Sequence, residues 1–384
     1  NDPKSYYLTV DLTVISTTDN GIIVKGDGVT IDLNGFSLTG PGKGVGTGIG
    51  ILIQSNFNVT IKNGMVRRFG SHGIVDAVGS ITTVGHRVVN VISRENGGHG
   101  ISLTNGNNGG GHALVRESWA AANTLDGIKV GTGSKVIGST SVANTGIGIS
   151  GLDDLVVSES TLRNNATGGI VSGKGSNLTG NVVANNGGNG IATSTAATIS
   201  GNTLKGNSGA GIITGSGSLI KGNVVKENTG NGIHASFIAY VEENMVADNL
   251  GTAIFTQLFS VVSNNNVHGG ISGIRVGDSS RVLNNHVYGV NPLGTAQEAG
   301  IVIGGGTQVS GNNLRENGWA QIYVPGTISF IEDNTMSYSV ANGRVGVKIT
   351  GTGNYYAGNR SHGAAPDYEV NNITNTDGGG NVSF

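Results

Sequence analysis

The chain has 384 residues, of which 69 are glycine and none is cysteine, and its formal net charge is −2. The lack of cysteine excludes a disulfide framework and a thiolate metal site. The lack of a basic run argues against nucleic acid as a partner, because phosphate binding needs a footprint of lysine and arginine. No apolar run reaches the ~18 residues that a transmembrane helix needs, so no membrane span is predicted.

Residues 1–48 lack the regular repeat that follows them. Two stretches rich in β-branched and aromatic residues, 6–10 and 12–15, predict short strands. Without a cap, the first coil of a repetitive fold exposes unpaired strand edges and an open apolar core to water. We therefore expect residues 1–48 to form an N-terminal cap and the first coil.

Residues 49–347 carry a bulky apolar residue at regular intervals, usually after glycine. Between Ile128 and Ile254 the interval is 21 residues, repeated without interruption. Two further apolar positions recur 8 and 13 residues after the first, separated by Gly, Asn and Ser. Each line of the repeat predicts three short strands, and stacked lines share one interior. The sequence therefore predicts an all-β fold, a single-domain parallel β-helix solenoid of about 14 coils.

Two asparagine columns follow the same period. One stands 11 residues after the first apolar position and runs from Asn181 to Asn312; the other stands five residues before it and runs from Asn96 to Asn317. We expect these residues to take the left-handed conformation of tight turns. Their amides would bond the turn backbone and the asparagine of the next coil. The columns are thus predicted to be structural ladders.

Three intervals of the repeat are longer than the others. The lines that begin at Ile74 and Ile101 hold extra residues near 76–85 and 104–111, and the line from Ile274 holds them near 291–299. Long loops on a rigid scaffold usually carry binding groups, so the first two are predicted to wall a groove. Residues 348–384 are expected to form the last coil and a C-terminal cover.

The repeated Gly-Ile steps and asparagine ladders resemble the right-handed parallel β-helices of the pectate-lyase-like superfamily. The stretches Val29–Phe36 and Asn58–Gly64 resemble the first coils of bacterial secreted members. The resemblance implies that the parallel β-helix is right-handed and that the partner is a polysaccharide. It is specific for fold and not for activity, because the superfamily carries lyases, hydrolases, epimerases and non-enzymatic proteins. The residues predict no cofactor, and only the resemblance admits calcium.

A charged column stands two residues before the first strand of successive lines. Because only 12% of the residues are charged, its clustering beside the two insertions argues against chance and suggests a site; the alternative is a set of ordinary polar turn residues on a solvated face. A carboxylate beside an imidazole or ammonium suits acid–base catalysis, and paired carboxylates suit glycoside hydrolysis. In a β-elimination Lys129 or a histidine would take the proton; in a hydrolysis Asp126 would pair with one of two later aspartates. The predicted catalytic residues are His72, His99, Asp126, Lys129, Asp153 and Asp154.

A second cluster lies at the first insertion. Its two histidines are expected to stack, and its tryptophan offers a platform for a sugar ring. Two imidazoles without a third ligand are too few for a metal site, so no metal is predicted. The predicted substrate-binding residues are His86, Arg87, His112, Arg116 and Trp119.

The function indicated by these features is that of an exported polysaccharide-active protein, either a lyase or a glycoside hydrolase that acts on an acidic glycan in a groove. The alternative is a non-enzymatic structural, adhesive or appendage β-helix. The Asp-Pro-His-Asp segment found in alginate epimerases of this fold is absent. The low charge and the abundance of Asn, Ser, Thr and Gly favour a secreted, extracellular or periplasmic bacterial protein. The oligomeric state is not predicted.

Overall fold

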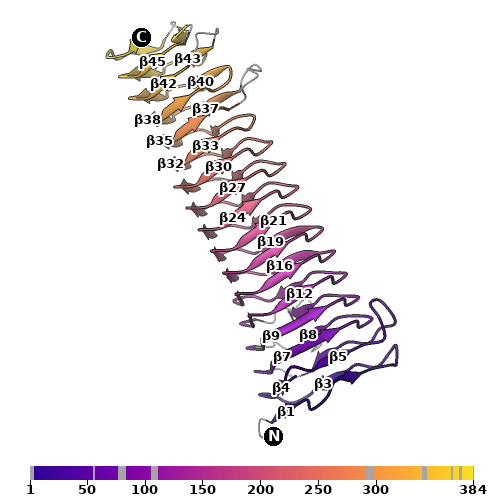
Figure 1. Ribbon diagram of the computed structural model, residues 1–384. Coiled ribbons are helices and arrows are strands. Elements are labelled where there is room, and N and C mark those ends of the chain that lie inside the picture. Colours follow the sequence, from indigo (N-terminus) through magenta and orange to yellow (C-terminus); the bar gives the residue numbers. More distant parts are fainter. Residues whose placement is uncertain are drawn as a thin grey trace. The chain divides into compact units, whose positions relative to one another are not determined.

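The structure is a computed structural model that contains β-strands and connecting turns in its described residues. These residues divide into two compact units, Asn1–Ser194 and Thr195–Phe384. Within each unit the strands stack in parallel as coils of a β-helix (Figure 1). The described part holds no helix of the length and hydrophobicity that would cross a membrane. It comprises residues 4–54, 57–76, 84–104, 111–290, 298–339, 344–364, 366–371 and 374–383.

The described residues of the first unit form eight strands that each begin the repeat line of a coil, called first strands, and these pair in parallel from one coil to the next. They are β3 (Ile22–Val24), β6 (Ile51–Ile53), β8 (Ile74–Asp76), β10 (Ile101–Leu103), β13 (Ile128–Val130), β16 (Ile147–Gly151), β19 (Gly168–Ser172) and β22 (Ile191–Thr193). The second strands are β1 (Ser5–Tyr7), β4 (Thr30–Asp32), β11 (Leu114–Arg116), β14 (Lys135–Ile137), β17 (Val156–Ser158) and β20 (Asn177–Thr179). The third strands are β2 (Leu12–Thr13), β5 (Ser37–Thr39), β12 (Trp119–Ala121), β15 (Thr140–Val142), β18 (Thr161–Arg163) and β21 (Val182–Ala184).

Two coils of the first unit differ from the predicted three short strands. Their second and third strands merge into β7 (Thr60–Arg67) and β9 (Arg87–Arg94). Each merged strand contains one residue in the left-handed region, Asn63 with φ 59° and Asn90 with φ 55°. The merged strands therefore bend at a single residue instead of ending there.

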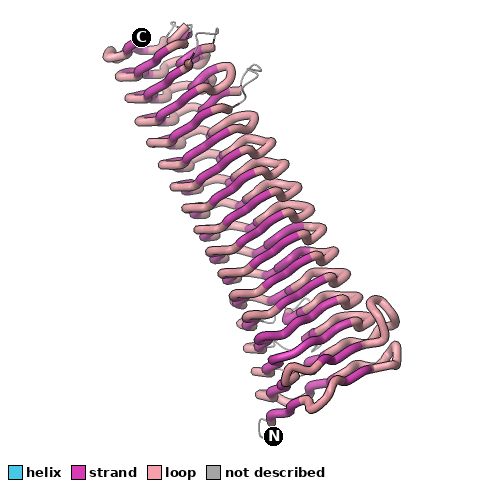
Figure 2. The backbone as a smooth tube through the Cα atoms, in the orientation of Figure 1, coloured by secondary structure: helices cyan, strands magenta, loops and turns pink. Residues whose placement is uncertain are grey.

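The second unit repeats the same arrangement (Figure 2). Its first strands are β25 (Ile212–Thr214), β28 (Ile233–Ala235), β31 (Ile254–Thr256), β34 (Ile274–Val276), β37 (Ala299–Ile303), β40 (Ala320–Val324), β43 (Val345–Ile349) and β46 (Tyr368–Val370). Its second strands are β23 (Thr198–Ser200), β26 (Leu219–Lys221), β29 (Tyr240–Glu242), β32 (Val261–Ser263), β35 (Arg281–Leu283), β38 (Gln308–Ser310), β41 (Phe330–Glu332), β44 (Tyr355–Ala357) and β47 (Thr376–Asp377). Its third strands are β24 (Thr203–Lys205), β27 (Val224–Lys226), β30 (Met245–Ala247), β33 (Asn266–His268), β36 (His286–Tyr288), β39 (Asn313–Arg315), β42 (Thr335–Ser337), β45 (Arg360–His362) and β48 (Val382–Ser383).

The predicted core is confirmed. Ile149 pairs in register with Ile128 and with Ile170, and all three side chains are fully buried. The second and third apolar positions of the same coil, Val157 and Leu162, are also fully buried. Each inward side chain therefore packs on its counterpart one coil away, and the columns share one continuous apolar interior.

The tight turns place one residue of each in the left-handed region. In the coil that starts at Ile149 these residues are Asp154, Glu159 and Asn164, with φ values of 56°, 53° and 56°. The ladder asparagine is the residue that follows, such as Asn165, and it lies outside the left-handed set. The prediction that the ladder asparagines adopt this conformation is therefore wrong. The left-handed residue bends the chain, and the asparagine that follows it, such as Asn165, is fully buried.

The asparagine ladders themselves are confirmed. The Asn144 Oδ1 accepts two hydrogen bonds from Asn123, one from its backbone N–H at 3.0 Å and one from its side-chain Nδ2 at 2.9 Å. In the second unit Asn244 accepts the same pair of bonds from Asn223, at 2.9 and 3.0 Å. A serine ladder was missed: the Ser139 N–H donates to Ser160 Oγ at 3.1 Å. These bonds satisfy turn N–H groups that would otherwise be buried without partners.

The prediction of about 14 coils is too low, because the described residues form about 17 turns. Strands β1 and β2, within the segment expected to act as a cap, pair with β4 and β5 as ordinary coil strands. At the other end β44 and β45 pair with β47 and β48. These terminal strands carry fewer buried apolar residues than the central ones, so the periodic pattern does not reveal them.

Candidate functional site

The structure brings His72, His99 and Asp126 together, as their shared column predicts. They directly precede β8, β10 and β13, three neighbouring first strands. The two imidazole rings stack with their centroids 5.2 Å apart and 11° between their planes. The His99 Nδ1 lies 3.7 Å from the Asp126 Oδ2. The column is thus a continuous stack of three polar side chains.

Each side chain of this column accepts a hydrogen bond from a backbone N–H of the next coil along the chain. The His99 N–H donates to His72 Nδ1 at 2.9 Å, and the Asp126 N–H donates to His99 Nδ1 at 3.0 Å. The Ile147 N–H donates to Asp126 Oδ1 at 2.8 Å. Asn20, in the same column, accepts from the Ile49 N–H at 2.9 Å. A nitrogen that accepts carries no proton, so each imidazole is the neutral tautomer with its proton on Nε2.

The electrostatics of the column keep both imidazoles neutral. Burial lowers the pKa of His99 from 6.5 to about 4, although the Asp126 carboxylate opposes the shift. Burial also lowers the pKa of His72, and the nearby Lys129 charge adds to this effect. In each ring Nδ1 is occupied by a backbone N–H and Nε2 carries the proton. The histidines therefore have no basic nitrogen to offer a substrate, and the geometry favours a structural role over general-base catalysis.

Titration of His99 is expected to destabilise the protein in acid. A pKa lower in the folded than in the unfolded chain stabilises the fold above pH 6.5, and this stability is lost as the pH falls from 6.5 toward 4. At about 1.4 kcal/mol per pKa unit, the loss is of the order of 3 kcal/mol. His99→Asn should reduce the pH dependence, because an asparagine oxygen accepts the same backbone bond at Asn20. Urea unfolding at pH 7 and pH 4 measures the difference, and equal pH dependence in both proteins would contradict the assignment.

Lys129 and the aspartates after β16 complete the set of predicted catalytic residues. Lys129 is half-buried on β13, in register with Ser102 and Ser150. Asp126 precedes β13, whereas Asp153 and Asp154 follow the neighbouring strand β16, so they stand at opposite ends of paired first strands. The Asp153 Oδ1 accepts from the Lys174 N–H at 3.0 Å, and Asp154 is a left-handed turn residue. The pairing of Asp126 with Asp153 or Asp154 as acid and base, at about 5–5.5 Å or 6.5–9.5 Å, therefore stays a prediction.

The second cluster divides into buried and exposed members. His86 is only 2% exposed. Its Nδ1 accepts from the Val59 N–H at 3.1 Å and its Nε2 lies 3.7 Å from Asp76 Oδ2. Arg87 pairs with Leu114, which places His112 opposite Gly85 rather than His86. The prediction that His86 and His112 stack is wrong, because the buried pair of Val88 and Val115 sets a register one residue away.

The exposed members lie on the outer face of the second and third strands. Arg87 and Arg116 are exposed on the neighbouring strands β9 and β11. Trp119 is 48% exposed on β12 and stands between Ile92 and Thr140 in register. Most of each predicted insertion lies outside the described residues, namely 77–83 of 76–85, 105–110 of 104–111 and 291–297 of 291–299. The described part holds no group of three or more His, Asp or Glu side chains suited to a metal ion.

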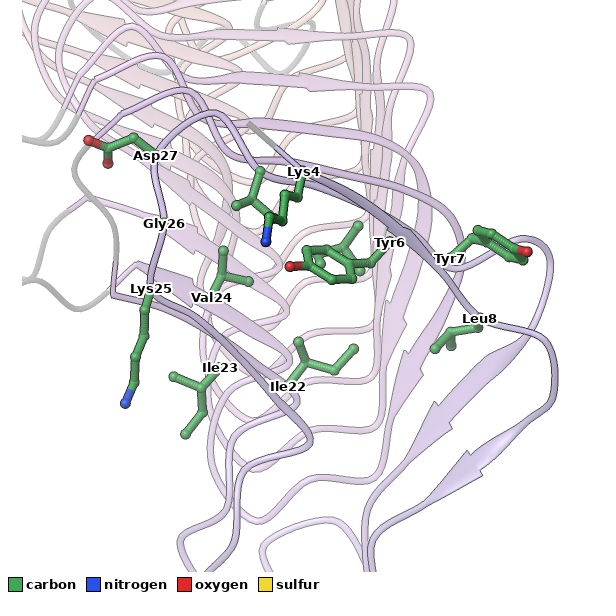
Figure 3. Close-up of a pocket in the computed structure, with 12 residues that line it drawn as sticks. Lys4, Tyr6, Tyr7, Leu8, Ile22, Ile23, Val24, Lys25, Gly26 and Asp27 are labelled. Atoms are coloured by element: carbon green, nitrogen blue, oxygen red, sulfur yellow. The ribbon is translucent and has the colours of Figure 1, made fainter. Parts of the chain in front are cut away.

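A cavity opens at the first coil of the first unit (Figure 3). Its volume is about 820 Å³, and apolar side chains of β1, β3 and β4 form much of its wall. None of the predicted site residues lines it. The cavity is the end of the apolar interior, where no further coil among the described residues covers it. Its lining includes Tyr6, Ile22, Val24 and Ile31 together with Lys4 and Lys25.

Comparison with solved structures finds β-helices of low sequence identity. The A-module of the mannuronan C-5 epimerase AlgE4 of Azotobacter vinelandii is 14% identical over 91% of this chain and 90% of that chain, with a TM-score of 0.46. The catalytic unit of a GH87 α-1,3-glucanase from Streptomyces thermodiastaticus is 15% identical over 99% of this chain and 62% of that chain, with a TM-score of 0.36. The Dettilon tailspike protein is 14% identical over 92% and 59%, with a TM-score of 0.32. The chain thus spans less than two thirds of the last two, and the likeness concerns fold alone.

Family membership follows from the sequence of the repeat. No curated protein matches the chain. The family model described as "Right handed beta helix region" matches residues 47–204 and 145–292, which together cover more than half of the chain. The chain belongs to the right-handed β-helix family.

Proposed function

We propose that this protein binds an acidic polysaccharide on the outer strand face of its first unit, at a surface formed by Arg87, Arg116 and Trp119. The observation that carries the proposal is the exposure of Trp119, whose indole is 48% accessible on a strand that is paired on both sides. An indole fixed on a rigid strand offers a flat apolar face to a sugar ring without a loss of loop entropy. Trp119 is therefore the stacking platform of the proposed surface.

The arginines set the expected charge of the ligand. Arg116 is exposed on β11, three residues before Trp119, and Arg87 is exposed on the neighbouring strand. A guanidinium group binds a carboxylate in a bidentate manner, which fits the uronic acids of acidic glycans. The Arg116 Nε lies 3.6 Å from the Glu117 carboxylate, an exposed pair that a ligand carboxylate can replace at little cost.

The proposed function is glycan binding at the Trp119 surface. The column of His72, His99 and Asp126, called the His–Asp column, is not expected to cleave the glycan. The histidines hold backbone N–H groups, and both oxygens of Asp126 are engaged, Oδ1 by the Ile147 N–H and Oδ2 by the Ser150 hydroxyl at 2.8 Å each. These contacts favour the non-enzymatic alternative over a lyase or hydrolase that uses this column. Binding of an acidic glycan also fits a secreted or periplasmic location, where such polymers occur.

Trp119→Ala is expected to weaken binding to polygalacturonate or alginate at least tenfold, about 1.4 kcal/mol, because the stacking face is removed. Calorimetry and affinity electrophoresis measure the change, with dextran as the neutral comparison. Tyr240→Ala is the matched control, since this aromatic residue is similarly exposed on a strand of the second unit. Equal affinities of Trp119→Ala and the wild type for every glycan would refute the proposed surface.

Activity assays separate binding from cleavage. The same glycans are incubated with the protein and followed by the absorbance of unsaturated products and by new reducing ends. No turnover is expected from the wild type. Depolymerisation that Asp126→Asn abolishes would instead make the column catalytic and would contradict the non-enzymatic proposal.

A further inference from the structure

Three neighbouring third strands of the second unit present an unusual set of outward side chains. Strands β33, β36 and β39 pair in parallel, and the residues of each row are in register. One row is His268, Tyr288 and Arg315, and the other is Asn266, His286 and Asn313. We call these six residues the His–Tyr shelf.

The aromatic rings of the shelf touch one another. The Tyr288 ring lies 4.5 Å from the His268 ring, between centroids, with the planes tilted by 40°. It lies 5.2 Å from the His286 ring, with the planes 29° apart. Tyr288 is 36% exposed and the His268 side chain is 39% exposed. The three rings therefore form one continuous aromatic surface that is open to solvent.

Polar groups hold the shelf in place and border it. The His268 Nδ1 lies 2.8 Å from the Asp248 Oδ1, and this contact leaves the His268 Nε2 at the other side of the ring. Gly289 allows the ring this position, because a Cβ there would lie 3.2 Å from the imidazole. At the opposite end Arg315 is exposed in register with Tyr288. The shelf thus runs from a carboxylate–imidazole pair to a guanidinium group.

The same outward positions carry different residues in the preceding coils of the second unit. Strand β24 has Thr203 and Lys205, and strand β27 has Val224 and Lys226. Such β-branched and lysine side chains are common on a solvated strand. Imidazole, phenol, amide and guanidinium groups stand together over three consecutive coils, and the next strand, β42, carries Thr335 and Ser337 at these positions. The three coils replace side chains that suit a strand surface with side chains that suit recognition.

We propose that the His–Tyr shelf is a second glycan-binding site, and that its ligand is a chain containing uronic acid. A sugar ring would stack on the Tyr288 and His286 rings, as apolar C–H groups do on aromatic faces. The Asn266 and Asn313 amides and the His268 Nε2 would bond its hydroxyl groups, and Arg315 would bind its carboxylate.

The chemistry of the shelf favours a glycan over other polymers. A nucleic acid would need a basic footprint, whereas this chain has a net charge of −2 and the shelf holds one arginine opposite an aspartate. A peptide bound by its side chains would need an apolar pocket, whereas the shelf residues project from a strand face and are polar or aromatic. The shelf shares no residue with the surface around Trp119, so the two proposals stand or fall separately.

The test uses the full chain and compares Tyr288→Ala with the control Tyr240→Ala, in both the wild-type and the Trp119→Ala backgrounds. Polygalacturonate and dextran are the probes, and calorimetry gives the affinities. Tyr288→Ala is expected to lower the affinity for polygalacturonate at least fivefold in either background, and Arg315→Ala to lower it for polygalacturonate but not for dextran. The melting temperature should stay unchanged, because the side chains of Tyr288 and Arg315 are exposed.

The outcomes separate the shelf from the surface around Trp119. Weaker binding in Tyr288→Ala with normal binding in Trp119→Ala supports the shelf and refutes the other surface. The reverse result refutes the shelf. If the wild type binds neither probe, both proposals are overturned.

Discussion

Replacing Ile191 with aspartate is expected to unfold the first unit. The Ile191 side chain is 0% exposed and pairs in register with Ile170 of the neighbouring coil. A carboxylate there would stand in an apolar column without a partner, and burial of an unpaired charge costs more than the ~5–15 kcal/mol by which a typical domain is stable. Circular dichroism melts should show loss of the cooperative transition.

Ile23→Asp is the matched control for this change. Ile23 also lies on a first strand of the first unit, but its side chain is 47% exposed. Its replacement should leave the melting temperature within a few degrees of the wild type, about the effect of an ordinary surface substitution. An Ile191→Asp protein that melts like this control would show that the register of the coils is wrong.

Asn223→Ala is expected to cause the second-largest loss of stability. The Asn223 Oδ1 accepts from the N–H and the Nδ2 of Asn202, at 2.9 and 3.0 Å. Its Nδ2 donates to the carbonyl oxygens of Ile199 and Lys221 and to the Asn244 Oδ1. Alanine would leave several of these buried groups without partners, at about 1–3 kcal/mol each, so the free energy of unfolding should fall by roughly 3–5 kcal/mol.

Urea denaturation measures this loss. Asn177→Ala is the control, because Asn177 is an exposed asparagine at the start of a second strand. Its replacement should change the free energy of unfolding by less than about 0.5 kcal/mol. Equal effects of the two substitutions would mean that the ladder bonds contribute nothing beyond the loss of a surface amide.

Most of the fold was predictable because the physical requirements repeat in every coil. Buried residues such as Ile149 and Val157 recur at fixed offsets, and the interior accepts only apolar side chains there. The terminal coils were not predictable in this way. Strand β2 has two exposed residues, and its place is set by backbone pairing with β5, which leaves no periodic signal in the side chains.

The candidate site shows a different limit. The shared column correctly placed His72, His99 and Asp126 beside one another. Spacing does not show which atom of a side chain faces the backbone, so the role of Nδ1 as an acceptor was not predicted. Asn231 in the same column accepts the Thr252 N–H at 2.9 Å. The recurrence of asparagine among the histidines and aspartate was the available signal for a structural ladder.

The ladders also bear on how such a chain folds. The Asn123–Asn144 and Asn223–Asn244 bonds each join residues 21 apart, and the other bonds of the standard coils span nearly the same distance in sequence. Adding a coil therefore introduces no contact between more distant segments, and the mean separation of contacts relative to chain length falls as the solenoid grows. Because folding rates decline with that ratio, a longer member need not close longer loops than a short one. Each new coil can form on the edge of the preceding coil by the same loop closure.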